Sequence, residues 1–299
     1  MPQTGIVVRR TKSFYYVDVG ETEPRLCRIR GNLFKGKSHQ NKIAVGDEVE
    51  IDLKAAEDAG WILRMLPRRT KLSRRPGMGG EPEHVLVSNA DTLLIVASLL
   101  NPPFRGGLVD RFLVAGLSGG LETVLILSKA DLVTSAEITP IKKLYSSLNC
   151  TVLVTSVPEF RGLEQLRELM QNRTSVLSGH SGVGKSSLIA ALYPDWKIRI
   201  GQVSEKSGKG RHTTIMAEMF RLPQGGFIVD TPGIRALEPL VSPEELDAHF
   251  VEFIPFLGQC KFKGCSHRHE PQCVIKEAVT AENITEKRYK SYCSIYDSL

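Results

Sequence analysis

The sequence has no long apolar run. No stretch of about 18 apolar residues occurs in its 299 residues, so it predicts no membrane-spanning helix and no membrane partner. Its first five residues, 1–5, lack the basic and then apolar pattern of a secretory signal peptide. We therefore expect a cytoplasmic protein. In that reducing compartment the six cysteines need not form disulfides.

Internal repeats and long low-complexity segments are also lacking, and the charge is uneven. The chain carries a net charge of +6, and residues 1–80 hold 16 Lys and Arg against 9 Asp and Glu. That segment alone has a balance of +7, so the rest of the chain is close to neutral. A basic segment beside a neutral one indicates a polyanionic partner. A basic surface that serves only solubility is the alternative.

Residues 1–68 contain short strand-like runs separated by turns rich in glycine and charge, which predict a small barrel. An OB-fold fits this spacing, and such barrels bind nucleic acid through basic and aromatic strand faces. A basic, glycine-rich stretch without periodicity follows at 69–83, and we expect a linker there. The runs are Gly5–Val8, Phe14–Val19, Leu26–Arg30, Asp47–Ile51 and Trp61–Arg64.

From Val85 to about Leu237, apolar strands alternate with helical stretches. This alternation predicts an α/β domain with a mostly parallel sheet. Ligands of such sheets bind at the carboxyl ends of the strands. The expected helices cover Gly107–Leu117, Ile138–Leu148 and Gly162–Gln171.

The segment Gly179–Ser186 fits the phosphate-binding pattern G-x-x-x-x-G-K-[ST]. It follows an apolar run that ends in Val176 and Leu177, and a helix is expected from Ser186. Glycines let the backbone N–H groups point at phosphate oxygens, and the helix N-terminus adds its dipole. Lys185 would reach the β- and γ-phosphates, and the Ser186 hydroxyl would bind magnesium. A chance glycine-rich turn is the alternative, but it does not explain the strand–loop–helix context.

Two further segments complete a nucleotide site. Gly226–Val229 reads as a strand ending in Asp230 and Gly233 of a D-x-x-G pattern, where Asp230 would hold magnesium through water. The Gly233 N–H would face the γ-phosphate. Between the two motifs, Gly208–Thr214 is a basic, glycine-rich loop that fits a GTPase switch, in which one threonine binds magnesium. Thr213 and Thr214 are both candidates, and we favour Thr214. A solvated loop with no role is the alternative.

Ser128, Lys129, Ala130 and Asp131 follow an apolar strand and resemble the base-reading motif of GTPases, usually Asn-Lys-x-Asp. Asp131 would accept two hydrogen bonds from the guanine edge, which adenine does not offer. Ser128 replaces the usual Asn and cannot supply an amide's paired donor and acceptor, so a weaker affinity for guanine is expected.

A second strand, Val152–Val154, ends in Thr155 and Ser156, which resemble the loop that touches the guanine carbonyl. The base-reading motif precedes the phosphate loop by about 50 residues, whereas it follows that loop in Ras-like proteins. This reversed order indicates a circular permutation.

The last third of the chain holds a cysteine–histidine cluster. Cys260, Cys265, His267 and Cys273 have the spacing C-x4-C-x-H-x5-C, and thiolate and imidazole are the ligands that structural zinc prefers. His269 competes for the histidine position. Reduced surface cysteines are the alternative to a metal site. A helix is expected over Glu244–Phe253.

These features together resemble the ribosome small subunit-dependent GTPase A family over essentially the whole chain. The resemblance rests on the permuted order, Gly179–Ser187, Gly210–Thr214, Asp230–Gly233 and the cysteine–histidine segments. It implies an N-terminal OB-fold at 1–68, a permuted P-loop GTPase domain at 84–238 and a helical zinc-binding domain at 239–299. It implies nucleotide contacts from Ser128, Lys129, Ala130, Asp131, Thr155, Ser156, Gly179, His180, Ser181, Gly182, Val183, Gly184, Lys185, Ser186, Ser187 and Gly233.

The family binds the small ribosomal subunit and its rRNA and acts late in subunit maturation. The resemblance implies that this chain hydrolyses GTP to GDP and phosphate with magnesium, stimulated by the subunit, and holds one structural zinc. We expect a monomer. A nucleotide-gated RNA-binding switch with incidental hydrolysis is the alternative, and a P-loop kinase or ATPase is disfavoured by Ser128–Asp131.

The residue after the D-x-x-G pattern is Ile234, whereas Ras-like enzymes have a glutamine that orients water. Ile234 cannot orient water, so another polar group is needed. We expect His212 to supply it and to act with Lys185 and Thr214 in catalysis. A solvated position or an RNA contact is the alternative for His212.

Overall fold

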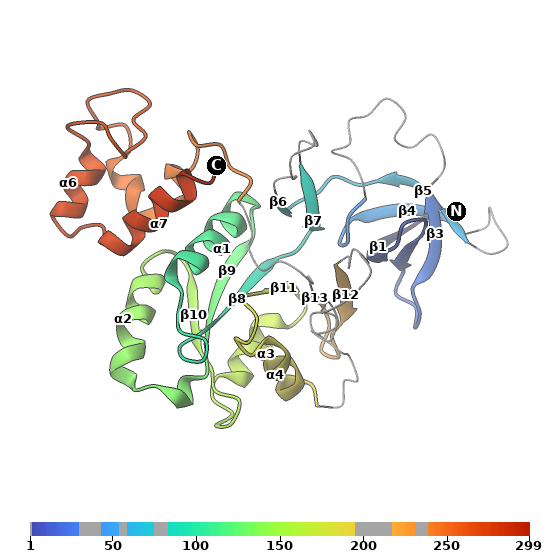
Figure 1. The fold of residues 1–299 in the computed structure, drawn as a ribbon. Helices are drawn as coiled ribbons and strands as arrows, with labels where there is room; N and C mark the ends of the chain where they lie inside the picture. The colour runs from blue at the N-terminus through green and yellow to red at the C-terminus, as the bar shows by residue number, and fades with distance from the viewer. Residues whose placement is uncertain (1, 30–42, 54–58, 75–82, 195–216, 231–238) are drawn as a thin grey trace, which may run out of the picture.

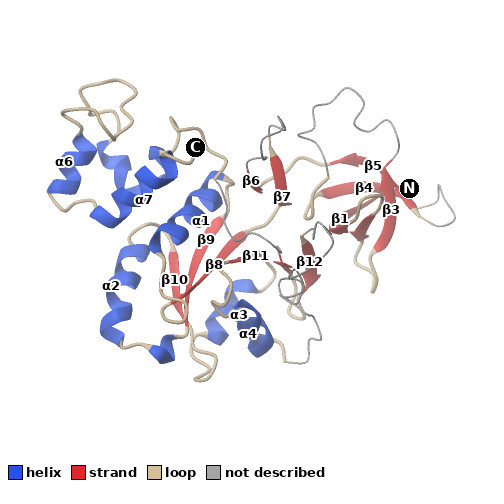
Figure 2. Cartoon of the chain, in the orientation of Figure 1, coloured by secondary structure: helices blue, strands red, loops and turns tan. Residues whose placement is uncertain are grey.

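The computed structural model describes residues 2–29, 43–53, 59–74, 83–194, 217–230 and 239–299. A strand-rich unit lies at one end, an α/β unit in the middle and a helical unit at the other end (Figure 1). Figure 2 shows how completely strands and helices separate between the two ends. The fold class predicted from the sequence is confirmed.

The N-terminal unit is a closed five-stranded barrel. Its strands run in the order β1-β2-β3-β5-β4, and β4 pairs back with β1. All neighbours are antiparallel except β3 and β5, which are parallel. Alternate residues point inward to form the barrel core: Val7, Val17, Cys27, Ile43, Val49, Ile51 and Ile62. The strands are β1 (Gln3–Arg10), β2 (Tyr15–Asp18), β3 (Arg25–Ile29), β4 (Glu48–Asp52) and β5 (Gly60–Met65).

Part of the predicted linker 69–83 forms a strand. β6 (Lys71–Arg74) pairs with β7 (His84–Ser88) in a separate two-stranded sheet. Leu72 is fully buried in the core of the α/β unit, and the Thr70 hydroxyl donates to the Ala90 carbonyl at 2.5 Å. Basic residues lie on both sides of Leu72, and a strand of four residues with one apolar side chain shows no recognisable alternation. The sequence pattern therefore did not predict this strand.

The central sheet has the order β10-β9-β8-β11-β13-β12, and only β12 is antiparallel to its neighbour. Helices α1 and α2 cover one face, and α3 and α4 cover the other. The strands are β8 (Thr92–Ser98), β9 (Glu122–Ser128), β10 (Thr151–Val154), β11 (Thr174–Ser178), β12 (Glu218–Arg221) and β13 (Phe227–Asp230). The helices are α1 (Gly106–Ser118), α2 (Ser135–Ser146), α3 (Leu163–Met170) and α4 (Lys185–Leu192), with a 3-10 turn η2 (Ala130–Leu132).

The barrel and the central sheet are joined edge to edge. β1 pairs with β12 at Arg9 and Glu218, so that the two units form one sheet of eleven strands. The Arg9 and Glu218 side chains lie 3.5 Å apart, and Arg221 on β12 donates to both oxygens of Asp18 at 2.8 Å. The barrel is therefore hydrogen-bonded to a strand that lies beside β13.

The C-terminal unit packs on α1 through α7 (Glu286–Tyr296) (Figure 1). It also holds α6 (Val274–Thr280) and the 3-10 segments η3 (Asp247–His249) and η4 (Val251–Phe256). The single helix expected over Glu244–Phe253 is wrong, because Phe250 between the two segments has an extended backbone (φ −101°, ψ 94°) and buries its ring in the core. None of the described helices is both long and apolar enough to cross a membrane.

A buried ion cluster fastens this unit to the central domain. Arg288 on α7 lies 2.6 Å from Asp110 on α1 and donates through Nε to Glu252 at 2.6 Å. The Arg288 and Asp110 side chains are only 4% and 3% exposed, and the Tyr145 hydroxyl donates to Asp110 at 3.0 Å. The Arg288 guanidinium also stacks over the Phe250 ring. Burial lowers the pKa of Arg288, but Asp110 and Glu252 outweigh it and raise that pKa.

Candidate functional site

The phosphate-binding pattern forms the loop between β11 and α4, as predicted. Gly179, Gly182 and Gly184 have φ values of +142°, +79° and +98°, which other residues rarely adopt. A Cβ on Gly179 would lie 2.3 Å from the Val96 carbonyl oxygen, so only glycine fits there. Lys185 begins α4, and its Nζ donates to the carbonyls of Gly179 at 2.7 Å and His180 at 2.9 Å. The lysine therefore lies over the mouth of the loop.

The described residues of the predicted motifs lie at one edge of the central sheet. Asp230 at the end of β13 is in register with Leu177 at the end of β11. On the other side, Ser128 at the end of β9 is in register with Ser98 at the end of β8. Since all these strands are parallel, their carboxyl ends form a single rim, which is where ligands of α/β sheets bind. Ser186 and Ser187 are exposed on the first turn of α4.

The base-reading motif is bonded to the phosphate loop. The Ser128 side chain is buried, and its hydroxyl donates to the Val183 carbonyl at 2.6 Å. Lys129 has a left-handed backbone (φ +58°), and its Nζ donates to the Gly182 carbonyl at 2.8 Å and to the Asn101 carbonyl. A short Ser128 hydroxyl thus still connects the two motifs across about 50 residues of sequence.

Asp131 and Ser156 lie together at the ends of neighbouring strands. The Ser156 hydroxyl donates to Asp131 Oδ1 at 2.7 Å, while Asp131 is exposed and Ser156 is fully buried. The Thr155 carbonyl accepts the Ala130 N–H at 3.1 Å, which fixes the turn that carries Asp131. The carboxylate is therefore held at the rim through one of its two oxygens.

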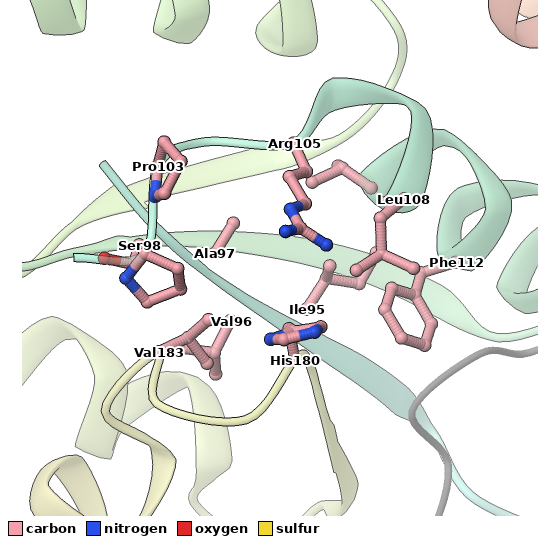
Figure 3. Close-up of a pocket in the computed structure, with 12 residues that line it drawn as sticks. Ile95, Val96, Ala97, Ser98, Pro103, Arg105, Leu108, Phe112, His180 and Val183 are labelled. Carbon is pink, nitrogen blue, oxygen red and sulfur yellow. The ribbon is translucent and has the colours of Figure 1, made fainter. Parts of the chain in front are cut away.

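A small cavity lies beside the phosphate loop, on the α1 face of β8 (Figure 3). Its volume of about 20 Å³ gives room for roughly one water molecule. Arg105 and His180 point into it from opposite sides (Figure 3). Sequence reasoning missed the segment 101–105, although a Pro102-Pro103 pair a few residues after the buried strand β8 marks a turn at the ligand-binding edge.

Four candidate site residues lie outside the described residues. They are His212, Thr213, Thr214 and Gly233, so their proposed roles stay predictions, and Ile234 lies outside as well.

Cys260, Cys265, His267 and Cys273 come together with their ligand atoms within 4.8 Å of one another. His267 Nδ1 lies 3.6 Å from Cys260 Sγ and 3.4 Å from Cys273 Sγ, and these two sulfurs are 3.9 Å apart. Zinc bonds of about 2.3 Å to sulfur and 2.0 Å to nitrogen, set tetrahedrally, require about 3.5 Å between N and S and about 3.8 Å between two S. The three distances among Cys260, His267 and Cys273 match this spacing, and Cys265 lies within 4.8 Å of these ligand atoms.

The structure also decides between the two histidines. His267 is 3% exposed inside the cluster, whereas His269 is exposed and outside it. Burial raises the pKa of the Cys265 thiol to about 12, so a bound cation is what would hold it as a thiolate. Glu270 accepts hydrogen bonds from Ser266 N at 2.9 Å and Ser266 Oγ at 2.7 Å and shapes the loop between the ligands.

The residues that surround the ligands come from other segments, which the spacing of the cysteines does not indicate. The hydroxyls of Tyr289 and Tyr292 on α7 donate to the carbonyls of His267 at 2.8 Å and Ser266 at 3.0 Å. Asp247 reaches the His267 ring from η3. The cluster is therefore tied to the same helix that carries Arg288.

Comparisons with known proteins agree on one family. The family model described as RsgA GTPase matches residues 65–239, and the RsgA N-terminal domain model matches residues 4–62. The small ribosomal subunit biogenesis GTPase RsgA of Chlorobaculum tepidum is 39% identical over 99% of this chain and 98% of its own length.

Two crystal structures share the fold. That of YjeQ from Thermotoga maritima superposes with a TM-score of 0.77 at 33% identity, over 100% of this chain and 99% of the other. That of YloQ, titled a circularly permuted GTPase, gives 0.72 at 26% identity, over 100% and 95% of the two chains. The chain therefore belongs to the RsgA GTPase family and is a circularly permuted GTP hydrolase.

Proposed function

We propose that this chain hydrolyses GTP to GDP and phosphate during late maturation of the small ribosomal subunit, and that the subunit stimulates the reaction. The observation that carries the proposal is the end-to-end match to a relative named for small-subunit biogenesis, at 39% identity. The compartment is then the cytoplasm, and the working form is a monomer. The domains run over 1–68, 84–238 and 239–299, with 69–83 between the first two, and β6 of this segment packs on the second domain.

Guanine binds at the rim that carries Asp131. The Asp131 carboxylate accepts the two N–H donors of the guanine edge, and Ser156 holds it in place. The loop of Thr155 and Ser156 contacts the guanine carbonyl. Lys129 and Ser128 hold the base subsite at a set distance from the phosphate loop, because both donate to carbonyls of that loop.

Phosphates bind over Gly179–Ser187, where glycine backbones and the start of α4 present N–H donors. Lys185 leaves its loop carbonyls to contact the β- and γ-phosphates. Ser186, Thr214 and Asp230 would hold the magnesium ion, and the Gly233 N–H would contact the γ-phosphate. The ion would supply positive charge against the charge that develops on the phosphates.

Hydrolysis needs a positioned water molecule, and His212 supplies the polar group for it. The expected result is that His212→Ala keeps its GTP affinity and loses most of the subunit-stimulated turnover, by on the order of 100-fold. Binding of the GTP-analogue form to the subunit is the control. A parallel loss of subunit binding would make His212 an RNA contact instead.

One structural zinc is held by Cys260, Cys265, His267 and Cys273. The donor set and its spacing support this assignment. Metal analysis of the purified chain is expected to find about one zinc per chain.

The rRNA contact lies on the basic barrel. The Arg9 guanidinium stacks over the Tyr16 ring at 3.7 Å, and that of Arg28 over the Phe14 ring at 4.8 Å. Cationic and aromatic side chains thus lie together on the barrel, as in proteins that bind single-stranded nucleic acid. Single-turnover GTP hydrolysis with purified small and large subunits tests the function. Stimulation by the small subunit alone supports it, whereas equal rates with both or neither would favour an RNA-binding switch with incidental hydrolysis.

A further inference from the structure

The two ring nitrogens of His267 face different surroundings. Nδ1 lies 3.6 Å and 3.4 Å from the sulfurs of Cys260 and Cys273. Nε2 lies 3.3 Å from Oδ2 of Asp247, on the other side of the ring. With His267 only 3% exposed, solvent has little access to either nitrogen. The ring is thus placed between a group of metal ligands and a carboxylate.

Asp247 is held in this position by its own segment. It begins η3, and the residues on either side of this turn, Leu246 and Phe250, are fully buried in the C-terminal core. The Phe253 ring packs edge-on against the His267 ring, with centroids 6.2 Å apart. These apolar anchors bring Asp247 to the cluster, although it lies 20 residues before His267 in the sequence.

The other polar contacts of this segment fix the backbone and not the ring. Tyr289 donates to the His267 carbonyl and Tyr292 to the Ser266 carbonyl. His267 itself has a left-handed backbone, with φ +58°. Within the described part of the chain, Asp247 makes the polar contact recorded for Nε2. The orientation and the tautomer of the ring therefore depend on Asp247.

We propose that Asp247 is a positioning residue of the zinc site, which accepts the Nε2–H of His267 and thereby presents Nδ1 as the zinc ligand. The inference rests on the zinc site proposed above. Histidine ligands of metals generally donate their second N–H to a carboxylate or carbonyl, and loss of that partner costs 10- to 100-fold in metal affinity. The Nε2–H tautomer leaves a lone pair on Nδ1 that can bind a cation placed among the cysteine sulfurs.

The first experiment identifies the ligand atom. The full chain is labelled with 15N-histidine and loaded with 113Cd²⁺, and the cadmium–nitrogen coupling is measured by NMR. Coupling to Nδ1 of His267 with a proton on Nε2 is expected. Coupling to Nε2 would overturn the proposal. Absence of any coupling to His267 would overturn the zinc ligand set together with it.

The second experiment measures zinc affinity by chelator competition. Asp247→Ala is expected to bind zinc about 10- to 100-fold more weakly than the unchanged chain. Asp247→Asn keeps an oxygen acceptor, so most of the affinity is expected to return. Glu244→Ala, an exposed acid three residues earlier, is the matched control and should bind normally.

The pattern among the variants separates positioning from simple destabilisation. In the Co²⁺-loaded form, the ligand-field spectrum of Asp247→Ala is expected to change, and that of Asp247→Asn to match the unchanged chain. Equal affinity and equal spectra for Asp247→Ala and Glu244→Ala would overturn the proposal and leave the zinc site standing. If Asp247→Ala fails to fold, the Asp247→Asn affinity and the cadmium coupling decide.

Discussion

The Ser156 hydroxyl donates a 2.7 Å hydrogen bond to Asp131, and the two residues belong to loops after neighbouring strands. Ser156 is fully buried, while Asp131 faces solvent at the rim. The relationship assigns a separate task to each residue. In the proposed GTP site, Asp131 would supply the charge that reads the base, and Ser156 would restrict the rotation of that carboxylate before the base binds.

Ser156→Ala is therefore expected to weaken GTP binding selectively. A hydrogen bond to a charged group contributes about 1.5–3 kcal/mol, and because its loss lets the Asp131 carboxylate rotate, GTP affinity is expected to fall by up to roughly 100-fold. ATP does not use Asp131, and its weak binding should not change. Titration with fluorescent GTP and ATP analogues measures both affinities. An equal loss for the two nucleotides would mean that Ser156 serves folding only. Ser147→Ala, on the exposed end of α2, is the control.

Ser128 on β9 can be compared with Ser175, a buried serine on β11 without a hydrogen-bond partner among the described residues; β8 lies between these two strands. Ser128→Ala leaves the Val183 carbonyl without its donor, and a loss of about 1–3 kcal/mol in stability is expected. Ser175→Ala removes an unpaired hydroxyl and should be neutral or stabilising. Chemical denaturation of both variants measures the difference. Equal effects would show that the Ser128–Val183 bond does not stabilise the phosphate loop.

Arg288→Met tests the cluster between α1 and α7. The substitution leaves Asp110 and Glu252 buried without their cation, which is expected to cost about 3–5 kcal/mol. Lys290→Met, whose ion pair on the same helix is 71% exposed, should cost less than about 1 kcal/mol. Thermal unfolding followed by near-UV circular dichroism compares them. A small effect of Arg288→Met would mean that apolar packing alone holds the C-terminal unit.

The barrel is hydrogen-bonded to β12, so removing residues 1–68 would damage the central domain as well as the proposed RNA contact. Substituting exposed cations is the cleaner test. Lys12→Gln with Arg28→Gln is expected to weaken small-subunit binding and to reduce the slope of log K against log[salt] by about one for each lost phosphate contact. GTP affinity should stay unchanged. An unchanged salt slope would place the RNA contact elsewhere.

The low pKa of Glu270 predicts that the stability of the cysteine-rich loop depends on pH. Burial raises its pKa, but hydrogen bonds from Ser266 and Arg268 outweigh burial and lower the pKa from the ordinary 4.5 to about 2. Because the folded pKa is depressed, the stabilisation is complete above pH 4.5 and is lost as the pH falls toward 2. Glu270→Gln is therefore expected to have a lower unfolding temperature at pH 7. The gap between the two proteins should shrink below pH 4.5 in scanning calorimetry, and a constant gap would contradict the assignment.

Local chemistry made much of this protein predictable. Gly179, Gly182 and Gly184 mark the phosphate loop, because only glycine readily takes the backbone angles that such a loop needs. Apolar runs such as Thr123–Leu127 mark buried strands without any knowledge of their neighbours. The reversed order of two motifs is a property of the chain alone, and it indicated the permutation.

Contacts between distant segments were decided only by the tertiary structure. The choice of His267 over His269, and the approach of Asp247 to it, depend on how η3 packs on the C-terminal core. The segment around Leu72 forms strand β6 because it pairs with β7 and buries Leu72 in the central core. The local sequence pattern does not indicate either contact. Ser128 keeps the base motif joined to the phosphate loop because Val183 comes within 2.6 Å of it. In each case the order of residues establishes which chemical groups are present, whereas the packing of segments far apart in the chain brings particular groups into contact.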